Sequence, residues 1–376
     1  MPKPVYRRYT KKVFIFGNLL VGILFLLGAY VRYVDPVQWW FLGLLTLSLP
    51  YLILALFIFF IFWVILRRIW VIISIIILAA GWEAVVNVIP LHFNGPFRIE
   101  KIPGSFRIMS WNVEHFDILH HKTHPETKQK MIDLINTYHP DIACFQEMVA
   151  SENKKAINNI DDFQHVLSFP DYYYSYEYKF NFDNLHHFGI IVFSRYPIIN
   201  RKTIEGQAQD YNSTFQYVDV LVNTDTLRVF NIHLQSLRFN QLNLNYLDNP
   251  GIRSDSDLVQ SKNVIRKLKS GFLKRAVQAE RVKLEMEQSP YPVLVCGDFN
   301  DVPQSFAYCT IGKGMQNAFA SKGTGIGRTF SAISPTLRID NIFADDHFKI
   351  EQVVKIGELL SDHFPIISDI SIRNRN

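Results

Sequence analysis

A carboxylate and a carboxamide directly follow an apolar run in the segment 292–301, which reads PVLVCGDFND. Residues 293–296 are typical of a buried strand, and Gly297 permits a sharp turn of the backbone. Asp298 and Asn300 are then expected at the carboxyl end of that strand, where both can reach one water molecule or one metal ion. A plain Gly-Asp turn would show the same pattern, so the catalytic interpretation depends on other segments.

Two earlier strand-like runs also end in polar residues. The run 106–112 (FRIMSWN) ends in Asn112, and the run 141–147 (DIACFQE) ends in Glu147. A carboxylate in this position is a hard oxygen ligand of the kind that Mg²⁺ prefers. Alternatively, Glu147 caps the next helix and Asn112 closes a turn. Glu114 and His115 follow Asn112 closely, and we expect them to be ordinary loop residues.

Histidine and aspartate recur in the second half of the chain. His233 follows the β-type run 227–232, and Asp362 and His363 lie in SDHFPI (361–366). A single histidine at a strand end is more often a hydrogen-bonded core or rim residue than a catalytic one. The SDHFPI segment could equally be a plain turn.

Seven segments resemble, in their order, the motifs of the endonuclease/exonuclease/phosphatase superfamily. They are SWNVEHF, DIACFQE, FGIIVFSRYPI, FNIHL, VLVCGDFND, RIDNIF and SDHFPI, and the resemblance covers about residues 106–370. The superfamily includes DNase-I-like nucleases, inositol-phosphate phosphatases and neutral sphingomyelinases. The resemblance implies an α/β fold, a four-layered sandwich of two mixed β-sheets flanked by helices.

The resemblance also implies roles for individual residues. Glu147 matches the principal ligand of Mg²⁺ or Mn²⁺, with Asn112 beside it, and Asp362 is expected to support the metal or the attacking water. The expected catalytic residues are His233, Asp298, Asn300, Asp340 and His363. Asp298 and Asn300 would polarise and position the water and contact the phosphate. His233 would contact the phosphate and could act as an acid. Asp340 would orient His363, because such a histidine needs a carboxylate to hold one tautomer and to stabilise its charged form.

A cluster of tyrosines and histidines precedes the third of these motifs. Tyr172, Tyr173, Tyr174, Tyr176 and Tyr178 are followed by His186 and His187. Such a cluster can line a polar substrate groove, and we name His187 as a substrate-binding candidate together with Asn300 and His233. An alternating tyrosine run is also an ordinary strand face. Asp219 could support the site or lie on the surface.

The first ninety residues are far more apolar than the remainder. Three stretches reach the length of roughly 20 apolar residues that a membrane-crossing helix needs. We predict transmembrane helices at about 13–34, 39–66 and 69–89 within a membrane region 1–90, then a linker 91–104 and a catalytic domain 105–376. A cleaved signal peptide is the alternative for the first span, but no small-residue cleavage site follows it.

The distribution of basic residues predicts the orientation. Five basic residues precede the first span and the pair Arg67-Arg68 separates the second from the third, so both loops are expected in the cytoplasm. The catalytic domain is then extracytoplasmic, on an integral protein of a bacterial inner membrane. Residues 1–98 contain nine Lys or Arg and two acidic residues, so the remainder has a net charge of −2 within a total of +5. This balance argues against avid, non-specific binding of nucleic acid.

A long connection, residues 235–271, separates the fourth motif from the fifth and runs into a helical pattern. Between Asp257 and Lys283 the pattern contains eight Lys or Arg and two acidic residues. A solvated basic surface is the simplest interpretation. Because this domain is predicted beside a bilayer, attraction to lipid head groups or to an anionic substrate is the alternative.

Together these features predict a membrane-anchored, divalent-metal-dependent phosphodiesterase with nuclease-like chemistry, in which water attacks phosphorus in line with the leaving oxygen. Its substrate would be a phosphodiester, either nucleic acid or a lipid head group, and no protein partner is implied. A phospholipid or sphingomyelin phosphodiesterase is the alternative enzyme. A catalytically inactive, membrane-anchored binding protein is the alternative of another class.

Overall fold

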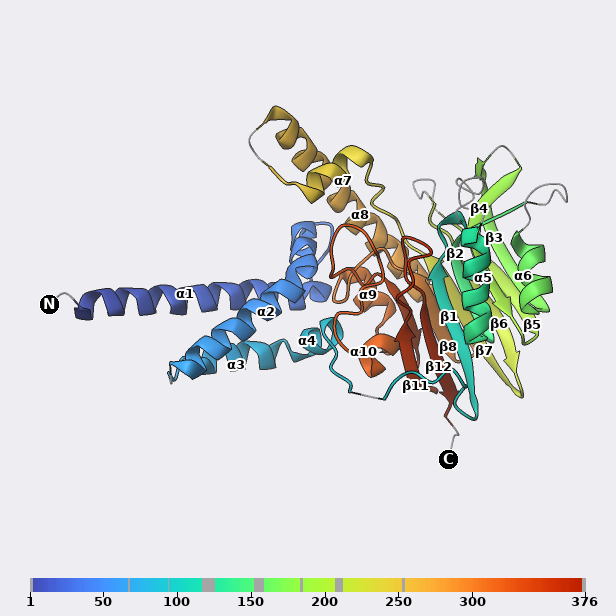
Figure 1. Cartoon of the computed structure of the whole chain (residues 1–376), viewed down its shortest axis with the longest axis horizontal. Helices are drawn as coiled ribbons and strands as arrows, with labels where there is room; N and C mark the ends of the chain where they lie inside the picture. The colour runs from blue at the N-terminus through green and yellow to red at the C-terminus, as the bar shows by residue number, and fades with distance from the viewer. Residues whose placement is uncertain are drawn as a thin grey trace.

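The computed structural model describes residues 3–66, 68–93, 95–116, 126–151, 159–182, 185–206, 212–251 and 254–373. An arm of apolar helices at the N-terminus leads into a β-sandwich that forms most of the remaining chain (Figure 1). The arm contains α1 (Lys3–Ala29), α2 (Gly43–Ile65), α3 (Val71–Ala80) and α4 (Trp82–Val88), with short 3-10 helices at Val31–Tyr33 and Trp40–Leu42.

Two stretches of the arm are long and apolar enough to cross a membrane, namely Tyr9–Ala29 and Trp40–Ile65. The third expected span, residues 69–89, is not one straight helix, because α3 and α4 are bent by 75° at Gly81. The ring of Phe25 packs so closely on Gly81 that any side chain there would collide with it. Glycine also interrupts helices readily. Residues 71–88 therefore form either a broken span or a re-entrant segment.

The helices of the arm form their own small core. Phe25 of α1, Leu56 of α2 and Ile77 of α3 belong to one buried cluster. Inside it, Asn18 and Ser74 exchange hydrogen bonds of 3.0 and 3.2 Å between α1 and α3. Such a pair satisfies polar groups that lipid could not, and it joins the two helices.

The sandwich consists of two mixed sheets of six strands, with the orders β11-β12-β1-β2-β4-β3 and β5-β6-β7-β8-β10-β9. The first sheet contains β1 (Ser105–Asn112), β2 (Ile142–Ser151), β3 (Asp171–Phe182), β4 (His186–Ser194), β11 (Phe348–Lys355) and β12 (Ile366–Ile372). The second contains β5 (Ile198–Ile204), β6 (Phe215–Val222), β7 (Asp225–His233), β8 (Val293–Asp298), β9 (Gln316–Asn317) and β10 (Asp340–Ala344). This arrangement confirms the predicted fold class.

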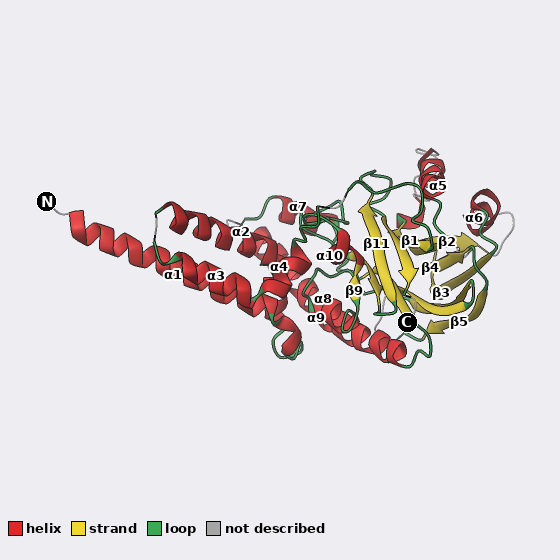
Figure 2. Ribbon diagram, turned by 90° about the horizontal axis from the view of Figure 1, so that it is seen from below, coloured by secondary structure: helices red, strands yellow, loops and turns green. Residues whose placement is uncertain are grey.

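Helices cover the outer faces of both sheets (Figures 1 and 2). They are α5 (Glu126–Tyr138) and α6 (Asn159–Leu167) on the first sheet, and α8 (Asp255–Glu287) and α9 (Phe306–Ile311) on the second. Helix α7 (Gln241–Asp248) packs on α8, and α10 (Ala318–Lys322) lies beside β10 and β11. Apolar residues of α5 and α6 share a core with Trp111 and Phe145 of the first sheet, and those of α8 and α9 share one with Phe230 and Val295 of the second. A third core fills the space between the sheets and includes Ile108 and Val229.

The arm packs directly on the sandwich. Phe272 of α8 contacts Gly43 at the start of α2, and the hydroxyl groups of Tyr51 and Ser334 are 3.2 Å apart. The expected linker is also held at its start, where Leu91 forms a β-bridge with Thr324. The sandwich therefore has defined contacts with the apolar helices.

Candidate active site

Strand register brings the predicted polar residues to one edge of the sandwich. Asn112 ends β1 and pairs with Gln146 of the parallel strand β2. His233 ends β7 and pairs with Asp298 at the end of the parallel strand β8. Asp340 then faces Asp298 across the antiparallel pair β8 and β10. Parallel neighbours end at the same sheet edge, so residues far apart in sequence meet there.

Glu147 lies at an irregularity of β2. The pairing with β4 shifts between Phe145 and Met148, and the backbone of Glu147 has a φ of 53°. Such a bulge redirects a side chain out of the regular pleat. Because Glu147 lies inside β2 and α6 begins only at Asn159, the alternative in which it caps the next helix is wrong.

Two imidazoles and a carboxamide surround the Glu147 carboxylate. His115 Nε2 is 3.3 Å from one oxygen, and His233 Nε2 is 3.7 Å from the other. Asn212 Nδ2 donates a hydrogen bond of 3.5 Å to that second oxygen. Burial lowers the pKa of His115 and of His233 to about 4, so both rings are neutral at physiological pH.

Asp298 is the centre of the hydrogen-bond network. Its Oδ1 accepts from the backbone N–H of Asn300 at 2.7 Å, and its Oδ2 accepts from the side-chain amides of Asn112 and Asn300, both at 3.2 Å. The same Oδ2 is 3.6 Å from His233 Nε2 and 3.7 Å from His363 Nε2. Burial raises the pKa of Asp298 above its ordinary value.

Asp340 and His363 form the predicted pair. His363 Nδ1 is 2.8 Å from Asp340 Oδ2, which leaves Nε2 directed toward Asp298. Burial opposes the charged imidazolium, but the carboxylates of Asp340 and Asp298 outweigh it and raise the pKa of His363 well above 6.5. The ring also packs on Phe330, with centroids 4.9 Å apart, and Trp111 Nε1 donates to the carbonyl of His363 at 2.9 Å. This histidine is therefore held in one orientation.

His233 presents a buried nitrogen without a hydrogen bond. Its side chain is only 2% exposed, and within the described residues Nε2 has no hydrogen-bond partner. Buried polar atoms are normally paired, because an unpaired one costs about 1–3 kcal/mol. This nitrogen lies between Glu147 and Asp298, which does not fit the alternative of an ordinary hydrogen-bonded core histidine.

Residues 113–116 contribute more than the sequence indicated. Glu114, His115 and Phe116 all have positive φ values, 43°, 61° and 53°, in the turn after β1. This turn brings His115 to Glu147, and the Glu114 carboxylate accepts a hydrogen bond of 2.9 Å from the backbone N–H of Asp362. We expected ordinary loop residues here. Their closeness in sequence to Asn112 was the signal that could have identified them.

A buried amide pair beneath the site also escaped the sequence reasoning. Gln146 Nε2 donates to Asn231 Oδ1 at 2.7 Å, and Asn231 Nδ2 donates to the carbonyls of Phe145 and Ile191. The pair joins β2 of the first sheet to β7 of the second. It therefore supports the two strands that carry Glu147 and His233.

The remaining candidates lie at varied positions. Asp362 is 41% exposed, and its Oδ1 is 3.9 Å from His363 Nε2. His187 lies on β4, where it pairs with Ala150 of β2, and its ring stacks on Tyr176. The side chain of Tyr178, another member of the Tyr and His cluster, lies outside the described residues.

Asp219 does not belong to the site. It forms a buried ion pair with Arg228 at 2.7 Å and accepts a hydrogen bond from Asn200. In the β6–β7 ladder its partner is Arg228, whereas the residues next to the site, Phe215 and Ile232, pair at the other end.

The donor set fits a divalent cation. Asp298, Asp340 and His363 offer ligand atoms within 4.8 Å of one another, but the Asp340–His363 pair already uses one nitrogen and one oxygen. Glu147 offers a partly exposed carboxylate ringed by neutral nitrogen and amide groups, with Asn112 on the adjacent strand. Hard oxygen ligands with room for water suit Mg²⁺, and imidazole neighbours are also compatible with Mn²⁺. Of these two groups, Glu147 is the one that could better hold such a cation.

Two mixed sheets flanked by helices, with polar residues meeting at one edge, define the fold class of the chain. The profile of the endonuclease/exonuclease/phosphatase family matches residues 109–363, and the chain belongs to this family. A second profile, a domain of unknown function, matches residues 11–88. No curated protein matches the chain.

Solved structures share the fold at low identity. A family protein from Bacteroides thetaiotaomicron is similar with a TM-score of 0.53 and 15% identity, over 73% of this chain and 100% of that one. The human Nocturnin catalytic domain with a bound sulfate anion gives 0.50 and 16%, over 73% and 97%. Danio rerio TDP2 in complex with a single-strand DNA product gives 0.50 and 14%, over 71% and 99%.

Proposed function

We propose that the chain is a membrane-anchored, divalent-metal-dependent phosphodiesterase that hydrolyses its substrate by in-line attack of water. The observation that carries this proposal is the convergence on Asp298. One buried carboxylate oxygen lies within 3.7 Å of two imidazole nitrogens that come from different strands and loops. A buried acid flanked by two imidazoles supports proton transfer and binding of a charged phosphate, and it is a costly arrangement for stability alone.

The protein's own residues divide the chemistry. Asp298 accepts a proton from the attacking water, for which a raised pKa is suitable, and Asn300 holds the carboxylate through two hydrogen bonds. His363, kept charged by Asp340, and His233 donate hydrogen bonds to phosphate oxygens as negative charge develops. A divalent cation bound by Glu147, with Asn112 and Asp362 nearby, would supply Lewis acidity to a phosphate oxygen.

The substrate proposal is a phosphodiester, with nucleic acid as the first candidate. The similar Danio rerio structure contains a single-strand DNA product, which supports this class. A lipid head group is the second candidate, because the catalytic domain packs on the apolar helices through Phe272 and Gly43. The two candidates differ in where the substrate arrives from, the aqueous phase or the bilayer surface.

The apolar helices are proposed to anchor the chain in a bacterial inner membrane with the catalytic domain outside the cytoplasm. Two or three helices are able to cross, and the basic residues before the first favour the cytoplasmic side. Protease treatment of intact spheroplasts tests this topology. Digestion of the catalytic domain without lysis is expected, and protection until lysis would reverse the orientation.

Hydrolysis by the purified full-length chain in detergent is the decisive experiment. DNA, RNA, sphingomyelin and inositol phosphates are offered side by side with Mg²⁺, with Mn²⁺ and with EDTA. Cleavage of one class only with metal is expected, together with loss of turnover in Glu147→Ala. If no substrate is cut while the protein is folded, the inactive binding protein becomes the better interpretation.

A further inference from the structure

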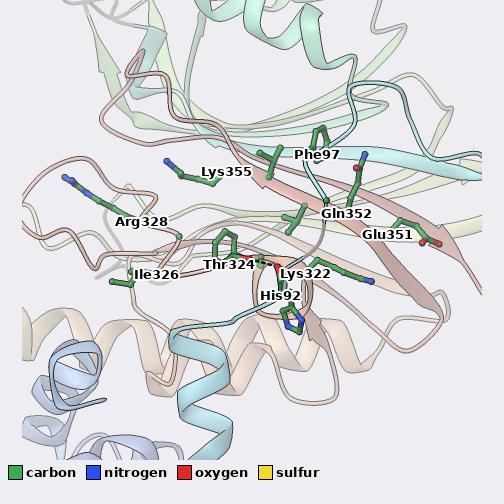
Figure 3. A pocket seen from close by; sticks show the side chains of 15 residues that line it. His92, Phe97, Lys322, Thr324, Ile326, Arg328, Glu351, Gln352 and Lys355 are labelled. Carbon is green, nitrogen blue, oxygen red and sulfur yellow. Dashed lines mark hydrogen bonds between the residues drawn. The ribbon is translucent and has the colours of Figure 1, made fainter. Parts of the chain in front are cut away.

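A cavity of about 510 Å³ lies between the linker, the loop after α10 and the edge strand β11 (Figure 3). Arg328 and Lys355 occupy one end of it and extend to the same side, while Lys322 and Glu351 lie toward the other end. The site residues described above are not part of its lining. The cavity is therefore a separate feature with two basic side chains at one end.

The basic end is attached to the segment that contains His363. The backbone N–H of Phe364 donates to the carbonyl of Thr329 at 2.7 Å, so the loop after Arg328 lies beside it. On the other side, Ile356 donates to the carbonyl of Pro365 at 3.0 Å, so the end of β11 is also adjacent. The segments with Arg328 and Lys355 thus lie on either side of residues 363–365.

Aromatic residues fix both cations next to the catalytic histidine. Arg328 Nε donates to the carbonyl of Phe330 at 2.7 Å, and the Phe330 ring packs on His363. Lys355 Nζ lies 4.4 Å from the centre of the Phe364 ring. Arg328 thus contacts Phe330, whose ring packs on His363, and Lys355 contacts Phe364, which follows His363 in the chain.

Neither cation has a carboxylate within ion-pair distance in the part of the chain that the structure describes. Burial lowers the pKa of Lys355, and the positive charge of Arg328 lowers it further. The two cations therefore lie near enough to influence each other. Two neighbouring positive charges at a cavity repel each other unless an anion binds between them. A phosphate group, with several acceptor oxygens, is the anion that such a pair suits best.

We propose that this cavity binds a second phosphate group of the substrate, which Lys355 and Arg328 hold while another phosphate is hydrolysed near Asp298. The inference rests on the proposed function. It adds that the substrate carries at least two phosphates, as an oligonucleotide or a phosphorylated lipid head group does. A substrate with a single phosphate would lack this contact.

Protection of Lys355 from acylation tests the proposal without requiring turnover. The full-length chain in detergent is treated with an amine-reactive reagent in EDTA, with and without millimolar inorganic phosphate, and each lysine is quantified by peptide mass spectrometry. Lys349 is the internal control, because it lies on the same strand and already pairs with Glu351 at 2.8 Å. We expect phosphate to slow modification of Lys355 at least threefold, to leave Lys349 unchanged, and to lose this effect in Arg328→Gln.

Equal protection of both lysines, or protection that persists in Arg328→Gln, would overturn the proposal. Further arms use thymidine 5′-phosphate and glycerol phosphate, and the ester that protects at the lower concentration identifies the source of the phosphate. Because the readout is a chemical modification in EDTA, failure here leaves the hydrolysis experiment unaffected. A failure of this inference can therefore be told apart from a failure of the proposed function.

A second inference comes from the exposed face of α8. Figure 1 shows α7 and the first half of α8 projecting from the sandwich on the side of the N-terminal arm. Helix α7 covers one side of α8, where Lys267 Nζ and Gln260 Oε1 hydrogen-bond to Asn243 at 2.7 and 3.0 Å. The opposite side of α8 has no such cover among the described residues.

Basic and apolar residues alternate on that uncovered side. Leu258, Lys262, Ile265 and Lys269 follow one another at spacings of four, three and four residues, which forms a single stripe. All four are exposed, with Leu258 and Ile265 at 46% and 47%. A face that exposes both apolar and basic side chains can bind an anionic bilayer surface, because burial of apolar area and attraction to anionic lipid both favour the contact.

The stripe continues into the contact with the apolar arm. Phe272 is the next residue of the stripe and packs on Gly43, and Lys269 Nζ lies 5.2 Å from the centre of the Trp40 ring. Trp40 precedes α2, where an aromatic residue at the membrane boundary is expected. The exposed face of α8 thus begins at the boundary of the predicted membrane span.

We infer that this face of α8 lies on the lipid head groups of the bilayer that anchors the chain. The occupant is an anionic phospholipid surface, which suits the lysines, while the leucine and isoleucine side chains enter the head-group region. The inference depends on the proposed membrane anchoring. Contact with the bilayer would hold the catalytic domain against the surface.

An environment-sensitive fluorophore on Ile265→Cys, in full-length protein reconstituted into vesicles with anionic lipid, reports the contact. Leu284→Cys is the matched control, because it is exposed on the same helix (59%) beyond the contact with the arm. We expect a lipid-borne quencher to reduce emission at 265 at least threefold more than at 284. Equal quenching in protein that floats with the vesicles would overturn the inference and leave the anchoring intact. A shift at 265 on adding oligonucleotide in detergent would also overturn it, since the face would then bind nucleic acid.

Discussion

Replacing Asp340 by asparagine tests whether the Asp340–His363 pair acts in catalysis. The carboxylate oxygen is 2.8 Å from His363 Nδ1 and is fully buried, so asparagine keeps the shape and removes the charge. In the proposed mechanism, a charged His363 stabilises the phosphate as negative charge develops. The substitution therefore weakens an interaction that strengthens in the transition state, and kcat should fall while KM changes little.

The size of the effect follows from the hydrogen bond. A hydrogen bond to a charged group is worth about 1.5–3 kcal/mol, and burial of this pair favours the upper end. A loss of about 3 kcal/mol from the transition state corresponds to roughly a 150-fold fall in kcat. The assay is steady-state hydrolysis of the best substrate from the side-by-side comparison, with full-length protein in detergent.

Asp219→Asn is the matched control for this experiment. Asp219 is also a buried carboxylate in an ion pair, with Arg228 at 2.7 Å, but it lies at the other end of the sandwich. Its substitution should lower stability and leave kcat unchanged. A kcat of Asp340→Asn within threefold of the unmodified protein, or an equal fall in Asp219→Asn, would refute the assignment of Asp340.

Three further outcomes are expected. Glu147→Ala should remove nearly all turnover while circular dichroism stays unchanged, and EDTA should do the same reversibly on addition of Mg²⁺ or Mn²⁺; near-normal turnover in either case would contradict the metal site. Arg107→Met should lower the free energy of unfolding by about 3–5 kcal/mol, because the substitution leaves the fully buried Asp369 carboxylate without its cationic partner; denaturation showing a change below 1 kcal/mol would contradict this. Gly297→Ala should prevent correct pairing of β7 and β8, since Gly297 has a φ of 148° and an added Cβ would lie 2.0 Å from the carbonyl oxygen of Ile232; a soluble, fully active variant would show that the strand can shift.

Several features of the fold follow directly from local sequence. Apolar runs such as 293–296 form buried strands, and the helical pattern between Asp257 and Lys283 lies within α8. The helix starts at a capping box in which Ser254 and Asp257 exchange hydrogen bonds. Such signals are local, because strand burial and helix caps depend on residues within a few positions of one another.

The third apolar segment shows where such reasoning stops. Its composition satisfies the length of a membrane span, and Gly81 alone does not require a break. The bend of 75° accompanies the packing of Phe25 from α1 against Gly81. Phe25 and Gly81 are more than fifty residues apart, so a sequence pattern read over about twenty residues cannot include this contact.

The sequence by itself determined the residue types and, for Asn112, His233 and Asp298, the strand ends that carry them. The strand end predicted at Glu147 was wrong, because β2 continues to Ser151. Only the tertiary structure decided which atoms meet, such as the 3.7 Å approach of His363 Nε2 to Asp298 and the 3.3 Å approach of His115 to Glu147. The physical reason is that polar side chains at strand ends are favourable locally whatever their partners. Their distances depend on strand register, on the bulge at Glu147 and on the packing of two sheets, which arise from contacts across the whole domain.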